Sequence, residues 1–199
     1  MSVGLFMGIG ASYVERAKDV GIHYLAAINT ALRERELGAY VDPKSPPNVY
    51  RGGLFGRSAL DYHSVGAFVA LGELAEEEAG FAHLELLATN PYRVAFLPTD
   101  FAEPFEIQHS ELIAGERPRL WVGSAPRLSS ELLAMAGGLA IPVAEGALSD
   151  AVAQQINAME PLFEGDTLAL AEDERPAWLA LFEGARLAVQ HGVALSLAG

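Results

Sequence analysis

The sequence predicts an α/β (or α+β) protein, a mixed sheet with helices packed on it that forms a single domain over residues 1–199. The alternation of elements predicts this fold class, and two features of the composition limit what else can stabilise it. Short apolar runs bounded by Gly or Pro alternate with longer segments whose apolar residues recur at helical spacing. Of the 199 residues, 51% are hydrophobic, so the chain can bury a sizeable core. It contains no Cys, which excludes disulfides and thiolate metal sites.

The strand at 94–97 is the element around which the rest of the sheet is expected to assemble. Val-Ala-Phe-Leu is an unbroken apolar run with no polar face, which predicts a strand buried on both faces. Pro98 can donate no ladder hydrogen bond, so the strand should end there. Thr99 and Asp100 then lie at the mouth of the sheet, where open α/β sheets place their ligands.

Four elements are expected before this strand: a strand at 3–9, a helix at 21–36, a short strand at 39–41 and a second helix that Ser58 opens. Gly38 is expected to end the first helix as a left-handed cap. Residues 42–57 hold three prolines and three glycines and are expected to form a long irregular loop, and loops of that length are usually functional or mobile. Residues 84–87 fit a strand or a helix.

The elements expected after the central strand continue the alternation. A strand at 105–107 should pair with one at 120–122, and 123–126 is a turn into a helix whose buried face includes Leu128 and Leu132. The rest of the chain is predicted as a helix capped by Ser149, a long helix from Asp173 to His191, and a terminal strand at 193–197.

Charge indicates the kind of partner. The formal net charge is −13, and residues 101–199 carry a balance of −9 against −4 for residues 1–100. A field of this sign repels nucleic acid and anionic membranes and attracts basic surfaces. We therefore expect a basic protein partner, no nucleic acid and no membrane, and leave the oligomeric state open. The chain has no apolar run of roughly 18 residues and no basic signal-peptide region, which favours the cytoplasm.

The expected binding residues are charged side chains in two segments. Glu103, Glu106 and Glu111 cluster just after the central strand and would contact the basic partner. Arg51 and Arg57, in the loop at 42–57, could hold an anion or a carboxylate of the partner.

Motifs for cofactors and metals do not match. After the first strand, Gly8 and Gly10 suggest a dinucleotide turn, but the third glycine of that fingerprint would fall at Tyr13. The glycine-rich run at 53–58 lacks the Walker spacing and its lysine. The five histidines include no pair at the spacing of a helical zinc site. We expect no cofactor and no metal.

A catalytic alternative rests on three polar residues. Asp100, Ser124 and His63 could meet at the mouth of the sheet and serve a hydrolase or transferase. Two of them also have a structural explanation: Asp100 as a turn residue, and Ser124, which is not in a G-x-S-x-G elbow, as the cap of the helix that Pro126 begins.

At Phe96-Leu97-Pro98-Thr99-Asp100-Phe101 the chain resembles a group of uncharacterised bacterial proteins with an aromatic-Leu-Pro-x-Asp-Phe segment. Two further similar pieces are 122–132 and 185–192. The resemblance implies that the three pieces belong to one fold, and it assigns no activity. In general character the chain is also similar to immunity proteins of bacterial toxin systems, an analogy from size and acidity.

Three functional hypotheses follow. The first is a cytoplasmic binding protein, an immunity or regulatory protein that neutralises a basic partner. The second is the hydrolase or transferase with its site around Asp100 and Ser124. The third is a housekeeping domain whose site is not visible in the sequence.

Overall fold

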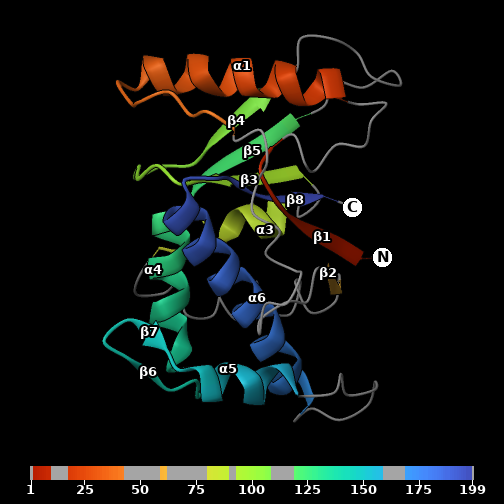
Figure 1. Ribbon diagram of the computed structural model, residues 1–199, viewed down its shortest axis with the longest axis vertical. Coiled ribbons are helices and arrows are strands. Elements are labelled where there is room, and N and C mark those ends of the chain that lie inside the picture. The colour runs from red at the N-terminus through yellow and green to blue at the C-terminus, as the bar shows by residue number, and fades with distance from the viewer. Residues whose placement is uncertain are drawn as a thin grey trace.

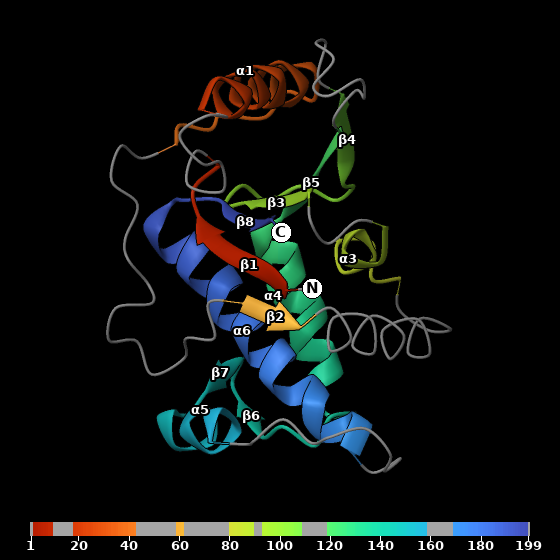
Figure 2. The ribbon, with the colours of Figure 1, turned by 90° about the vertical axis from the view of Figure 1, so that its right-hand side faces the viewer.

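A six-stranded mixed sheet forms the middle layer of the structure, with helices on both of its faces (Figures 1 and 2). The computed structural model describes residues 2–9, 18–42, 59–61, 80–89, 93–108, 119–158 and 169–198. The strand order is β2-β1-β8-β3-β5-β4. The strands are β1 (Ser2–Met7), β2 (Ala59–Asp61), β3 (Arg93–Leu97), β4 (Phe105–Gln108), β5 (Arg119–Ser124) and β8 (Leu195–Ala198). This arrangement confirms the expected fold class.

Strand β3 is interior, as its apolar run predicts. It pairs with β5 in parallel and with β8 in antiparallel orientation. The side chains of Val94, Phe96 and Leu97 are fully buried. The predicted pairing of 105–107 with 120–122 is also confirmed, with Ile107 opposite Leu120 in an antiparallel register.

Alternation along the strands divides the core into two halves. Ala95, Leu97 and Val122 face helix α1 (Lys18–Glu34), whose buried residues include Ile28 and Leu32. The opposite face packs against α3 (Glu85–Thr89), α4 (Ala125–Ala136) and α6 (Ala169–His191). Figure 1 shows α1 above the sheet, with α4 and α6 below it. The chain therefore forms three layers.

Helices α4 and α6 are held together by an aromatic anchor. Trp178 is fully buried, its indole N–H donates to the carbonyl of Leu132 at 2.7 Å, and its ring stacks on Phe182. A buried indole with its polar group satisfied contributes packing without an orphaned donor. Arg175 adds a second link, because its Nε donates to the carbonyl of Leu139 at 2.9 Å.

A small hairpin and a short helix form the end of the molecule far from α1 (Figure 2). Strands β6 (Val143–Ala144) and β7 (Ala147–Leu148) pair across a two-residue turn, and α5 (Asp150–Asn157) follows. Both turn residues, Glu145 and Gly146, have positive φ, as a type I′ hairpin requires. The expected cap at Ser149 is confirmed, since its hydroxyl accepts from the N–H of Val152.

The strand expected at 39–41 is absent from the structure. Tyr40 pairs instead with a side chain: its N–H donates to Asn29 Oδ1 at 2.7 Å, and its carbonyl accepts from Asn29 Nδ2 at 2.9 Å. One amide group thus satisfies both backbone groups that a strand would have paired. The Tyr40 hydroxyl accepts from the N–H of Ala194 and donates to Asp42, and burial raises the pKa of Tyr40 above its usual value.

Two helix boundaries were predicted wrongly. Ser58 does not open a helix at the next residues, because β2 follows immediately and pairs antiparallel with β1. The last helix begins at Ala169 rather than at Asp173. Residues 84–87, which fit either type, are mostly in α3. Apart from Asp42, the loop expected at 42–57 lies outside the described residues and stays a prediction.

The first helix ends differently from the prediction that Gly38 caps it. Glu36 takes the left-handed conformation, with φ 59°. The N–H of Leu37 bonds to the carbonyl of Leu32, and the N–H of Glu36 to that of Arg33, which is the Schellman pattern. A hydrogen-bond pattern rather than a glycine therefore ends α1. Within the described ranges, no helix combines the length and apolarity needed to cross a membrane.

Candidate functional site

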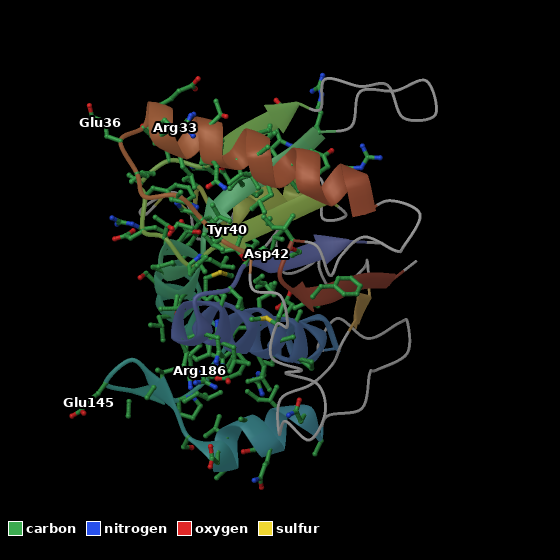
Figure 3. All side chains as sticks on the ribbon, turned by 45° about the horizontal axis from the view of Figure 1, so that its top comes forward. Arg33, Glu36, Tyr40, Asp42, Glu145 and Arg186 are labelled. Carbon is green, nitrogen blue, oxygen red and sulfur yellow. The ribbon has the colours of Figure 1, made fainter. Side chains whose placement is uncertain are left out.

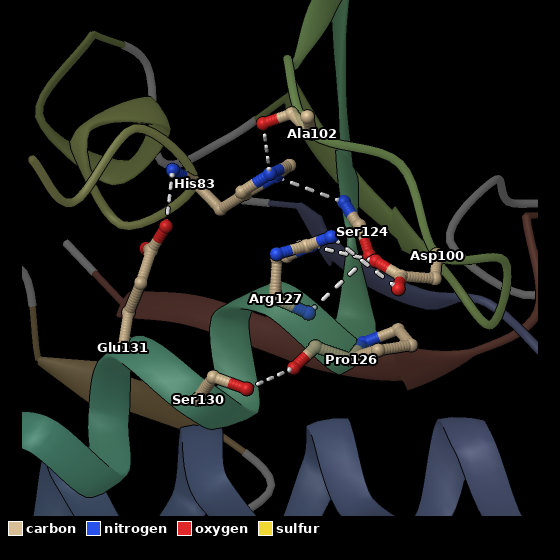
Figure 4. A network of polar contacts seen from close by, with 8 residues as sticks. All are labelled: His83, Asp100, Ala102, Ser124, Pro126, Arg127, Ser130 and Glu131. Carbon is tan, nitrogen blue, oxygen red and sulfur yellow. Dashed lines mark hydrogen bonds and ion pairs between the residues drawn. The ribbon is translucent and has the colours of Figure 1, made fainter.

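The parallel strands β3 and β5 end at the same edge of the sheet, and this places Asp100 and Ser124 close together (Figure 4). Asp100 follows β3 in the loop 98–104, and Ser124 is the last residue of β5. Arg127, in the first turn of α4, joins the two: its Nε lies 2.6 Å from Asp100 Oδ1, and its backbone N–H donates to Ser124 Oγ at 3.3 Å. The sequence thus predicted the location of this cluster.

Ser124 serves as the cap of α4. Its backbone is extended, its hydroxyl accepts from the third residue along, and Pro126 occupies the first turn, where its missing N–H costs nothing. The side chain is fully buried. The structural explanation of this serine is confirmed.

His83, which is not among the predicted site residues, completes the cluster. Its Nδ1 accepts from the backbone N–H of Ser124 at 3.0 Å, and its Nε2 lies 3.1 Å from the carbonyl oxygen of Ala102. A carbonyl oxygen can only accept, so Nε2 carries the proton. The ring is 1% exposed and makes an edge contact with Phe101. Burial lowers the pKa of His83 and keeps it neutral, and nearby Arg127 acts in the same direction.

Glu131 of α4 holds the backbone at His83 in place. Its two carboxylate oxygens accept from the backbone N–H groups of His83 and Leu84, at 3.1 and 2.7 Å. This carboxylate therefore satisfies two donors of the turn that leads into α3. Nothing in the local sequence around His83 indicates these contacts, because the partners come from α4, more than 40 residues later.

These contacts do not form a nucleophile–base pair. The His83 nitrogen that faces Ser124 bonds its backbone N–H rather than its hydroxyl, and the hydroxyl accepts from Arg127. A serine nucleophile needs a base at its own oxygen. His63, the third member of the catalytic alternative, lies outside the described residues.

The carboxylates expected to bind a partner differ in availability. Glu103 is exposed. The side chain of Glu106 is 24% exposed and lies 3.2 Å from the Nε of Arg119, and Asp100 is held by Arg127. Among the predicted residues, Glu111, Arg51 and Arg57 lie outside the part of the chain that the structure describes.

Other exposed carboxylates lie along the same side of the molecule. Glu36 follows the end of α1 and Glu145 lies in the β6–β7 turn, and Figure 3 shows both pointing outward on one side. The end of α1 adjoins the loop 98–104, because the Arg35 guanidinium lies 4.3 Å from the ring centroid of Phe105. Glu36 and Glu145 are not among the predicted binding residues, since neither belongs to the acidic cluster just after the central strand.

Titratable residues do not gather into a metal centre in this part of the structure. Across the described ranges, no group of three or more His, Asp or Glu side chains could hold an ion. The expectation of no metal remains a prediction for the whole chain.

A comparison with protein families matches residues 68–197 to the family described as "Putative DNA-mimic protein". The match covers more than half of the chain, including β3, β5, α4 and α6. The chain belongs to this family. No curated protein and no solved structure matches it. All three pieces that suggested a resemblance lie inside the matched segment, whereas the role of 96–101 as a family signature stays a prediction.

Family membership corrects one expectation. The prediction of no nucleic acid among the partners assumed only that an acidic chain repels DNA, and it is wrong for a family named for imitating DNA. The physical reason is that negative charge, which repels DNA itself, is the property that a DNA-binding surface recognises. A basic protein partner agrees with the family description.

The charge of the chain is concentrated in the matched segment. Residues 68–197 carry 20 acidic and six basic side chains, a balance of −14. Residues 1–67 carry six acidic and seven basic side chains, a balance of +1. The whole acidic excess of the protein therefore lies within the family segment.

Proposed function

We propose that this protein binds a DNA-binding protein by presenting carboxylates where that protein otherwise meets DNA phosphates. The observation that carries the proposal is the coincidence of the acidic excess with the family segment, −14 in residues 68–197 against +1 elsewhere. A general need for solubility would not confine the charge to one segment.

The proposal fits the way proteins hold DNA. Half to two-thirds of protein–DNA hydrogen bonds go to the phosphate and sugar groups rather than to bases. A folded protein with fixed carboxylates can therefore occupy a groove lined by Lys and Arg without reproducing any base. The partner's DNA site is then blocked by competition.

Glu103 is the described carboxylate that best fits this role. It is exposed on the loop 98–104, and no ion pair joins it to another described residue. Asp100 and Glu106 flank it, each already beside an arginine of this chain. These arginines orient the two carboxylates and reduce their charge, so Glu103 should make the larger contribution to attraction.

The biological role that we propose is neutralisation of the partner in the bacterial cytoplasm, as an immunity or regulatory protein would do. Blocking a DNA site inactivates a nuclease toxin and a transcription regulator by the same contact. Gene neighbourhood distinguishes them: a toxin reading frame next to this gene supports the immunity role.

The test captures partners from the source lysate with the tagged full chain and then adds duplex DNA of about 20 base pairs. We expect the captured protein to bind DNA, the duplex to displace it, and affinity to fall steeply between about 50 and 200 mM salt. Capture that is insensitive to the duplex and to salt would contradict the mimicry.

Two variants with the same change in net charge locate the surface. Glu103→Gln should weaken binding about two- to fivefold, as the loss of one exposed charge contact predicts. Ala26→Lys, at an exposed position of α1 outside the family segment, should change affinity much less. Equal effects of the two variants would show that net charge alone matters and that residues 100–106 are not the contact.

A further inference from the structure

We propose that His83 is a pH-sensitive lock, whose protonation breaks the link that the ring makes between the loop 98–104 and the start of α4. The imidazole joins three segments that are distant in the sequence: its own turn before α3, the loop through Ala102, and α4 through Ser124 (Figure 4). The lock follows from these contacts and does not depend on the proposed function.

The two ring nitrogens have fixed and opposite roles. Nε2 donates its hydrogen to the Ala102 carbonyl, so Nδ1 has to accept from the Ser124 N–H. A second proton on the ring would go to Nδ1, where it would face the hydrogen of the Ser124 amide. Two donors cannot bond each other, so the protonated ring has to leave this position or break the contact to α4.

The surroundings compensate the protonated ring only in part, because burial outweighs the backbone hydrogen bonds to Ala102 and Phe101 that favour the charged form. The ring is 1% exposed, so water does not solvate the added charge. From α4, Arg127 opposes a positive charge, and Asp100 from the loop favours one but is occupied by Arg127. The Glu131 carboxylate is bonded to the backbone N–H groups of His83 and Leu84. Phe101 presents a ring edge.

The direction of the pH effect follows from the pKa of His83, which burial lowers below its usual value of about 6.5. At pH above about 6.5 the ring is neutral in both the closed and the open state, and the lock is closed. As pH falls below about 6.5 the open state takes up a proton first, so opening becomes easier until the closed state is protonated too. Asp100 remains paired with Arg127, and the part of the loop next to Ala102 that is loosened carries the exposed Glu103.

The experiment measures amide hydrogen exchange of the full-length protein between about pH 4.5 and 8, expressed as protection factors so that intrinsic exchange is removed. We expect protection of the Ser124 amide to fall by up to about tenfold per pH unit below about 6.5 and to level off below the pKa of folded His83. Amides of the β1–β8 pairing should keep their protection and serve as the internal reference.

Two histidine variants separate the lock from other titrations. His83→Gln removes the titrating group, and the pH-dependent step at Ser124 should disappear. His191→Gln removes an exposed histidine at the end of α6 and should leave the step unchanged. A step that persists in His83→Gln overturns the proposal.

A second measurement decides the question even where His83→Gln does not fold. NMR of the wild-type ring follows its protonation directly, together with the amide shifts of Ser124 and Glu103. Ring protonation below the usual histidine pKa, in step with both amides, supports the lock. A ring that titrates at or above that pKa, or that titrates while both amides stay unchanged, refutes it.

Discussion

Phe96 on β3 packs directly against Gly123, its register partner on β5. A Cβ placed on Gly123 would lie 2.6 and 2.7 Å from two ring carbons of Phe96 and 3.1 Å from Leu86 Cδ1. Contacts under 3.0 Å are not tolerated by real side chains, so one group has to shift. Phe96 is fully buried in an interior strand and cannot move toward solvent. Gly123→Ala therefore overpacks this site.

Each single substitution has an expected cost. Phe96→Ala should lower the free energy of unfolding by about 3–5 kcal/mol, through lost burial and the cavity left behind. Gly123→Ala should cost about 1–3 kcal/mol through the clash. In the double variant the new methyl group occupies part of the space that the ring vacated. The clash disappears, and the double variant should be no less stable than Phe96→Ala alone, a coupling of about 1–3 kcal/mol.

Urea denaturation of the four proteins gives the cycle, with m-values checked for two-state behaviour. The melting temperature should fall by about 2–4 °C for each kcal/mol in a chain of this size. Gly137→Ala is the matched control, because Gly137 has helical φ and nothing lies within 4 Å of its added Cβ, so it should not destabilise. Additive losses in the Phe96–Gly123 cycle would refute the packing argument.

Three further predictions concern caps, a buried hydroxyl and metal. Ala140 has φ 52°, a left-handed conformation that glycine adopts at lower cost than alanine. Ala140→Gly should therefore raise the free energy of unfolding by about 1 kcal/mol in urea titrations, and a decrease would contradict this conformation. Tyr40→Phe should cost about 1–3 kcal/mol, because it leaves the buried N–H of Ala194 without its acceptor, and an unchanged urea midpoint would count against that bond. Chelator should leave the melting temperature unchanged, and a drop of several degrees that zinc restores would show a metal site.

Much of the fold was predictable because each successful prediction used a local signal. The apolar run at 94–97 needs no partner to identify it as a buried strand, and Ser124 followed by Pro126 forms a cap from adjacent residues. The strand predicted at 39–41 is wrong because a group from another segment replaced the expected strand partner. Tyr40 lacks a strand partner because the Asn29 amide takes both of its backbone groups.

The two helix ends with a nearby glycine also differ in whether residue type alone predicted them. Gly192 closes α6 with φ 64°, as a glycine cap predicts. At α1 the left-handed residue is Glu36, two positions before the nearby glycine. The hydrogen bonds of Glu36 and Leu37 to Arg33 and Leu32 offset the conformational cost. Residue type predicts a cap only where the preferred residue and these bonds coincide.

The edge of the sheet at which Asp100 and Ser124 lie was predictable from the sequence, but the hydrogen bonds around them were not. Topology alone brings Asp100 and Ser124 together, since parallel strands end at one edge. His83 was missed because its partners, Ala102 and Ser124, belong to other segments, and no spacing in the sequence relates them.

Charge is the property for which sequence and structure answer different questions. Composition gives the sign of the charge expected on the partner, since a net charge of −13 favours a basic surface wherever the carboxylates lie. It does not tell which carboxylates are available. Asp100, Glu103 and Glu106 look equivalent in the sequence, but Arg119 reaches Glu106 across the β4–β5 pairing, and Arg127 reaches Asp100 from α4. These internal arginines fix two of the three carboxylates, whereas no ion pair joins Glu103 to another described residue. Under the proposed function, Glu103 is therefore the carboxylate that we expect to contact the partner.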